Sequence, residues 1–390
     1  MNFRSGRHFL QLPKPTNIPD QILRTMDRAT IDHRGAEFAE MTGQLLSSLN
    51  RVFGGAEHVF IFPSSATGAW EAAMVNTLSP GDRVLMFDHG FFANNWRMVA
   101  ERLGVTVDFV AGDWRCAIAP SIVEAKLAED QNHQYRAVMI VHNETSTGVV
   151  TDVAGIREAM NRAQHPALLL VDTVSSLASM EYEHRAWGVD VTVSGSQKGL
   201  MLPPGLSFNA VSQKALDGNA QATLPQSYWR WDAIREFNER GFFPYTPATN
   251  LLYGLLEAVT MLHEEGLPRV FARHARLAEA TRRAVKTWGL EIFAREPAER
   301  SQTVTTVFVP DGLDADTLRR VILERFDMSL GSGLGALKGK VFRVGHLGDF
   351  NDLMLAGTLS GIEMGLQASG VRAAGSGVTA ALEFLASEES

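Results

Sequence analysis

The sequence predicts an α/β protein: a large domain with a mostly parallel sheet flanked by helices, and a smaller C-terminal α+β domain. Short apolar runs alternate with helical patterns across residues 59–205, which is typical of parallel strands joined by crossover helices. Two of these runs, 167–171 and 189–193, lead into polar residues, as strands that open onto a binding crevice do. A chain of 390 residues is also long enough for two domains.

The N-terminal third is predicted to contain an arm and then the first helices and strands. Prolines between positions 12 and 19 exclude a regular helix, so residues 1–20 are predicted to form an arm. Residues 20–53 are predicted to be helical with a turn near 32–35, because Phe38, Met41, Leu45 and Leu49 recur at helical spacing. We then predict strands at 59–62, 83–87, 105–111, 137–141 and 207–211, and helices at 70–78, 121–129 and 152–162.

We predict a large domain at 21–262 and a small domain at 263–390. A helical region that starts at 251 links them, and the small domain has a predicted strand at 304–309 and helix at 315–326. The glycine-rich segment 329–335 lacks the strand and helix context of a nucleotide loop, so we interpret it as a flexible loop over the site. His274 lies in a basic helix and is predicted to face solvent.

Composition narrows the classes of partner. The formal net charge of -8 disfavours nucleic-acid and anionic-membrane partners. No apolar run approaches the roughly 20 residues of a membrane span. The single cysteine, Cys116, cannot form an internal disulfide, and the first residues show no secretory signal, so we expect a cytoplasmic protein. We predict no metal site.

Asp172 and Lys198 carry the predicted chemistry. Each follows a short apolar run, so an acid and an amine are expected near two strand ends. Pyridoxal phosphate (PLP) needs a lysine for its Schiff base and an anionic partner for its pyridinium nitrogen. Taken singly, Asp172 could cap a helix and Lys198 could be a solvated loop residue. Together they favour a PLP site.

Residues 63–69 form a candidate phosphate loop. They contain small and hydroxyl side chains between a predicted strand and a predicted helix, and unpaired N–H groups at a helix start favour an anion. The hydroxyls of Ser65 and Thr67 add donors. The same residue types also cap ordinary helices, so this signal alone is weak.

The segments 171–176, 194–199 and 203–205 resemble the class V, fold-type I aminotransferases, and especially the serine–glyoxylate and alanine–glyoxylate group. The resemblance runs from about residue 13 to about residue 348. It implies a fold-type I PLP-dependent transferase that moves an amino group from serine, alanine or aspartate to glyoxylate.

The resemblance also implies roles for individual residues. Lys198 and Asp172 are the catalytic pair, Thr246 reaches the partner's site in a homodimer, and Arg343 binds the substrate carboxylate, as a planar fork of donors can. The family usually has glycine where Lys14 stands. The implied cofactor contacts are Ser65, Ala66, Thr67, Phe92, Thr145, Asp172, Val174, Gln197, Lys198 and Thr246.

Two other readings remain open. The first is another class V enzyme, either a cysteine desulfurase or a kynureninase-like hydrolase. A desulfurase needs a reactive cysteine on a mobile loop, and Cys116, between a predicted strand and helix, is poorly placed for that. The second is a non-catalytic PLP-binding module, as in some transcription regulators, although this chain has no basic segment for a DNA-binding domain.

Overall fold

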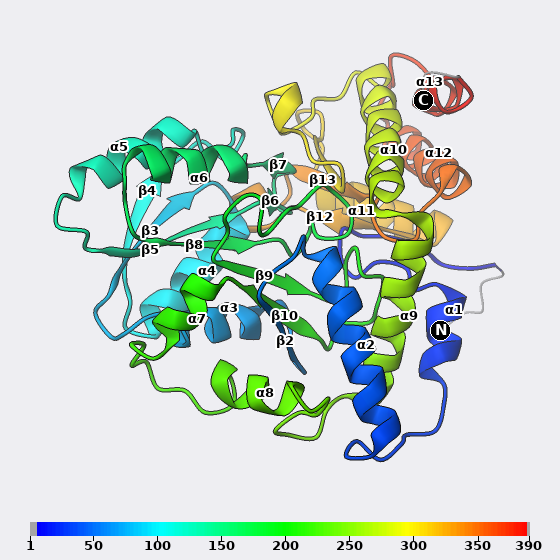
Figure 1. The fold of residues 1–390 in the computed structure, drawn as a ribbon. Coiled ribbons are helices and arrows are strands. Elements are labelled where there is room, and N and C mark those ends of the chain that lie inside the picture. Colours follow the sequence, from blue (N-terminus) through cyan, green and yellow to red (C-terminus); the bar gives the residue numbers. More distant parts are fainter. Residues whose placement is uncertain (1–5, 388–390) are drawn as a thin grey trace.

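A seven-stranded sheet forms the centre of the larger part of the molecule (Figure 1). The computed structural model describes residues 6–387. All strands run parallel except β10, which is antiparallel to both neighbours, so the predicted mostly parallel sheet is confirmed. The strand order is β2 (His58–Phe62), β10 (Ser207–Val211), β9 (Val191–Gly195), β8 (Leu168–Asp172), β5 (Tyr135–Val141), β3 (Arg83–Asp88) and β4 (Thr106–Ala111).

The register of the central strands brings their carboxyl ends together. Asp172, the last residue of β8, pairs with Val141 of β5 on one side and Val193 of β9 on the other. β9 ends two residues later, and the chain then leads directly to Lys198. The acid and the amine therefore leave the same edge of the sheet, where parallel sheets bind ligands.

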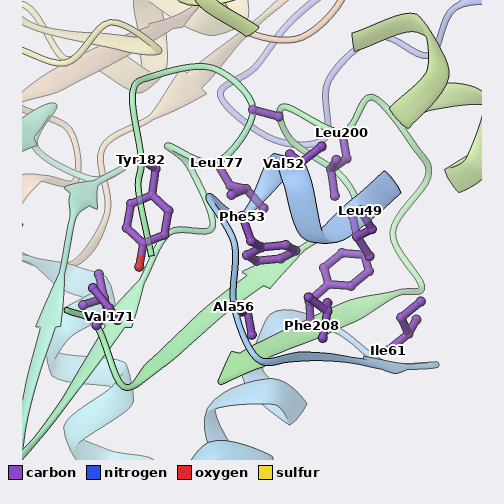
Figure 2. Packing of buried hydrophobic residues seen from close by; sticks show 14 of the residues in the cluster. Leu49, Val52, Phe53, Ala56, Ile61, Val171, Leu177, Tyr182, Leu200 and Phe208 are labelled. Carbon is purple, nitrogen blue, oxygen red and sulfur yellow. The ribbon is translucent and has the colours of Figure 1, made fainter. Parts of the chain in front are cut away.

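Helices cover both faces of this sheet. Because both faces are covered, the strands are apolar along their whole length rather than alternating. At the end of α2, Leu49 and Phe53 pack against Phe208 of β10 (Figure 2), with the two phenyl rings 6.1 Å apart. One face is covered by α2 (Ala36–Val52), α5 (Pro120–Glu129), α6 (Val153–Arg162) and α9 (Thr249–Glu265), and the other by α3 (Ala66–Val75), α4 (Phe91–Arg102), α7 (Gln213–Asn219) and α8 (Trp231–Asn238).

The C-terminal part has a sheet and a hydrophobic core of its own. Its sheet order is β1 (Phe9–Gln11), β12 (Met328–Ser332), β13 (Val341–Gly345) and β11 (Val304–Phe308). Its core is lined by residues between Leu277 and Leu385. Its helices are α10 (Leu267–Thr287), α11 (Ala315–Phe326), α12 (Asp352–Ala368) and α13 (Gly377–Leu385). The remaining short elements are α1 (Asp20–Met26), β6 (Asn143–Glu144), β7 (Val149–Val150), η1 (Pro297–Glu299) and η2 (Gly335–Leu337).

Two local predictions were wrong. Residues 329–332, the first half of the glycine-rich segment, belong to strand β12 instead of a loop, because β1 and β13 pair with this strand from either side. His274 is fully buried, and its ring bridges the carbonyl of Val270 and the N–H of Gly348. The basic residues of α10 had suggested a solvated face there. The predicted domain limits stay a prediction.

Among residues 6–387, no helix is both long enough and apolar enough to cross a membrane.

Candidate active site

A pocket of about 500 Å³, counted out to its solvent opening, lies at the carboxyl ends of β5 and β8. Nine of the predicted site residues line it, and the structure brings them together from segments as distant as 65 and 198. Arg343 and Thr246 are not among the lining residues. The pocket is lined by Lys14, Ser65, Ala66, Thr67, Trp70, Phe92, Val141, Asn143, Thr145, Asp172, Val174, Gln197 and Lys198.

Asp172 is a buried carboxylate held at both oxygens. The indole Nε1 of Trp70 donates to Oδ2 at 2.8 Å, and the backbone N–H of Val174 donates to Oδ1 at 2.7 Å. Burial raises the pKa of Asp172 to about 6, although both hydrogen bonds oppose this shift. A cation placed beside this carboxylate would relieve the cost of burying its charge. Trp70 was not predicted as a site residue.

Lys198 is buried, with 1% of its surface exposed. Its Nζ donates a hydrogen bond to the Thr145 hydroxyl at 3.3 Å. Burial holds the pKa of Lys198 well below its usual value, and the nearby cations Lys14 and Arg343 lower it further, against the pull of Asp172. A neutral amine can attack an aldehyde and can accept a proton, so a lowered pKa favours the form of Lys198 that Schiff-base chemistry needs.

The predicted phosphate loop lies where β2 ends and α3 begins. Ser65 stands at the N-cap position in an extended conformation, and its side chain makes no capping hydrogen bond. No acidic residue occupies the first turn, so the positive end of the helix dipole is not neutralised there. A Cβ at Gly68 would lie 2.8 Å from the Ser64 hydroxyl, so the loop packs tightly. This arrangement suits an anion.

Glu144 fixes the start of the helix that carries Phe92. Its carboxylate is fully buried and accepts hydrogen bonds from the backbone N–H groups of Phe92 and Ala93, each at 3.1 Å. It also accepts from the N–H of Ser146 at 3.0 Å. A Cβ at Gly90 would come within 2.2 Å of Glu144, so only glycine fits there. Sequence reasoning missed this role.

Arg343 lies on β13, and its guanidinium contacts the backbone of Thr145, which lines the pocket. Its Nε donates to the carbonyl of Ser332 at 2.7 Å, and its Nη1 donates to the carbonyl of Thr145 at 2.8 Å. Burial lowers the pKa of Arg343 to about 10, so the side chain stays charged at neutral pH. These two bonds leave further N–H donors of the guanidinium for a carboxylate.

Gln197 and Thr246 occupy different surroundings. Gln197 lines the pocket, and its Oε1 is buried with no hydrogen-bond partner among residues 6–387. Thr246 is exposed in the loop between α8 and α9 and is not one of the residues that line the pocket of its own chain. Neighbouring Tyr245 is anchored through its hydroxyl to the carbonyl of Ile61 at 3.0 Å.

These residues fit one cofactor. An acid and an amine share a pocket with an aromatic ring, and a helix start that suits a phosphate lines the same space. PLP carries an aldehyde, a ring nitrogen and a phosphate, and each finds a chemical counterpart here. Fold and pocket together define a fold-type I PLP-dependent enzyme.

Comparison with known proteins supports the assignment to a PLP-dependent enzyme. The family described as aminotransferase class-V matches residues 15–337. The chain is 45% identical to a serine–glyoxylate aminotransferase of Methylorubrum extorquens over 98% of this chain and 97% of that one. It is 42% identical to an L-aspartate–glyoxylate aminotransferase of Paracoccus denitrificans, over 95% and 94%. The structure of ureidoglycine–glyoxylate aminotransferase from Bacillus subtilis superposes with a TM-score of 0.92 at 25% identity, covering 99% of this chain and 100% of that one. The chain belongs to the class-V aminotransferase family.

Cys116 does not lie in this pocket. It sits between β4 and α5, where its thiol lies 3.8 Å from Asp113 and 3.7 Å from Arg295. Desolvation and the Asp113 carboxylate raise the pKa of the Cys116 thiol, which disfavours the reactive thiolate. Its position outside the pocket and the raised pKa of its thiol both argue against a desulfurase.

Proposed function

We propose that this chain transfers the amino group of a small L-amino acid, serine, alanine or aspartate, to glyoxylate, giving glycine and a 2-oxo acid. The observation that carries the proposal is the pairing of a buried carboxylate, Asp172, and a buried amine of lowered pKa, Lys198, in one pocket. The relatives described above support glyoxylate as the acceptor, since both curated ones are named for it.

Each side chain has a defined task in this proposal. PLP, when bound, withdraws electrons from the substrate Cα. Lys198 would hold the cofactor through Nζ and, once the substrate amine replaces it, would accept the Cα proton on Nζ and deliver it to the cofactor carbon that it had held. Asp172 keeps a proton on the ring nitrogen, and Trp70 and Val174 fix the orientation of its carboxylate. Ser65, Ala66 and Thr67 bind the phosphate.

Substrate binding rests on Arg343. Donor and acceptor both carry a carboxylate beside the reacting carbon, so one guanidinium serves both halves of the reaction. Its Nε and Nη1 are fixed by two backbone carbonyls, which orients the plane of the group. Phe92, Thr145 and Gln197 also line the pocket, where the ring of Phe92, the hydroxyl of Thr145 and the amide of Gln197 would help to hold the cofactor.

The assembly is a further part of the proposal. Thr246 is exposed on its own chain, which is consistent with a role in the site of a partner subunit in a homodimer. We also propose a cytoplasmic location, in which the single cysteine stays a thiol.

A donor panel tests the function. Purified holoenzyme is incubated with glyoxylate and serine, alanine, aspartate, cysteine or kynurenine, and glycine, 2-oxo acids, sulfide and the cleavage products of kynurenine are measured. Glycine should form only with a competent donor, and the Lys198→Ala variant should form none. Sulfide release from cysteine would favour a desulfurase, and cleavage of kynurenine a hydrolase. No amino-acid-dependent spectral change with any donor would favour a non-catalytic module.

A further inference from the structure

Lys14 lines the pocket with a basic side chain, and the proposed reaction gives this side chain no role. It lines the same space as Asp172 and Lys198, and its Nζ lies 4.4 Å from the centre of the Phe92 ring. The residue is partly open to solvent, although enough of its side chain is enclosed for burial to act on the ammonium group. Among residues 6–387, no carboxylate is in ion-pair contact with this ammonium group. Asp172 and Glu144 act on it only at longer range.

The backbone that carries Lys14 is fixed to both catalytic segments. On one side, the Thr16 hydroxyl donates to the carbonyl of Lys198 at 3.1 Å. On the other, the amide of Gln11 donates to the carbonyl of Gly345, on the strand that bears Arg343, at 2.9 Å. Lys14 lies between these two attachments in the chain, and its ammonium group is close enough to both Lys198 and Arg343 for the charges to act on one another.

The two carboxylates that act on Lys14 at longer range are already engaged elsewhere. Asp172 accepts from an indole and a backbone N–H, and Glu144 accepts from backbone N–H groups at the start of α4. Burial lowers the pKa of Lys14, and the charge of Arg343 lowers it further. An anion that touched both cations would remove this repulsion. A substrate with one carboxylate can satisfy Arg343 but leaves Lys14 without a counter-charge.

We propose that Lys14 binds the side-chain carboxylate of a dicarboxylic amino donor, so that the enzyme prefers an acidic amino acid over a neutral one. This inference rests on the proposed function and assigns the α-carboxylate to Arg343. The hydroxyl of serine or the methyl group of alanine would offer Lys14 no charge to bind.

Equilibrium binding of two unreactive acids to the holoenzyme tests this assignment. Succinate carries two carboxylates and propionate carries one, and titration calorimetry measures both affinities without turnover. In the Lys14→Gln variant, succinate should bind about tenfold more weakly or worse, the value of a lost charged hydrogen bond, and propionate should change by less than about twofold. Lys14→Arg should retain much of the succinate affinity. Lys126→Gln, on helix α5 outside the pocket, is the matched control.

Two results would overturn the assignment. Unchanged succinate binding in Lys14→Gln would mean that Lys14 does not contact the second carboxylate. Equal losses for succinate and propionate would mean that Lys14 only adds general positive potential. A donor panel on the same variants supplies a second readout, because kcat/KM for aspartate relative to serine should fall with the succinate affinity. Failure of glyoxylate as acceptor would refute the proposed function but would leave the binding result interpretable.

Discussion

The Asp172 carboxyl should stabilise the cofactor-free chain as the pH falls from 8 to 5. Burial raises its pKa from 3.8 to about 6 in the folded chain. Unfolding returns it to about 3.9, so the folded state takes up the proton first, and stability rises as the pH falls through 6. At pH 5, one unit below the folded pKa, protonation of Asp172 favours the folded state by about tenfold, or about 1.4 kcal/mol of unfolding free energy. The gain levels off below about pH 4.

Urea unfolding of the cofactor-free chain at pH 8, 6 and 5 measures this, with Asp172→Asn as the control. The comparison with the variant is needed because buried histidines change the unfolding free energy with pH in the opposite direction. Burial lowers the pKa of His142 and of His274 to about 4, so their contribution falls as the pH drops below about 6.5. The difference between wild type and variant isolates Asp172. A difference that stays constant with pH would show that the two hydrogen bonds already stabilise the ionised carboxylate, which would refute the reasoning.

Four further results are expected. Bound PLP should abolish the gain in stability at low pH, because a protonated ring nitrogen stabilises the ionised Asp172 carboxylate. If the holoenzyme still gains stability as the pH falls, that contact is wrong. Arg343→Gln should raise KM for amino and oxo acids by about tenfold to a hundredfold and change kcat less, and unchanged KM in steady-state assays would reject the carboxylate role. Glu144→Gln should lower the unfolding free energy by about 1–3 kcal/mol, because a neutral amide replaces a buried carboxylate that accepts several N–H donors. Thermal unfolding measures this change, and wild-type stability in the variant would contradict the structural role of Glu144. Thr246→Ala should weaken PLP binding in fluorescence titrations, and unaltered affinity would remove Thr246 from the site.

The placement of the proposed catalytic pair, Asp172 and Lys198, could be predicted because it depends on local signals. The apolar runs at 167–171 and 189–193 correspond to strands β8 and β9 with boundaries shifted by one or two residues. Strand length and hydrophobicity are properties of adjacent residues, so Asp172 and Lys198 could be placed at the same sheet edge before any long-range contact was known. The resemblance supplied the other site residues.

The supporting contacts could not be predicted because they join distant segments. Trp70 and Asp172 lie 102 residues apart, and Glu144 reaches back 52 residues to the N–H of Phe92. Nothing near Trp70 in the sequence distinguishes it from an ordinary core residue. His274 shows the same limit, because a helix rich in arginine gave no sign that this one ring faces the core.

Pairing between strands that are distant in the sequence also left no local signal. β1 joins the small sheet by pairing with β12, and residues 329–332 form a strand despite their glycine. Glycine weakens a strand on its own. The prediction of a loop therefore followed local preference, and the pairing of β12 with two neighbours outweighed it.

The central claim is that Lys198 holds the cofactor. Borohydride reduction of the holoenzyme fixes PLP to the amine that carries it, and mass spectrometry of the digested protein then locates the label. We expect the label on the peptide that contains Lys198. A label on Lys14 or on any other lysine, or no label in enzyme that binds PLP, would contradict the account.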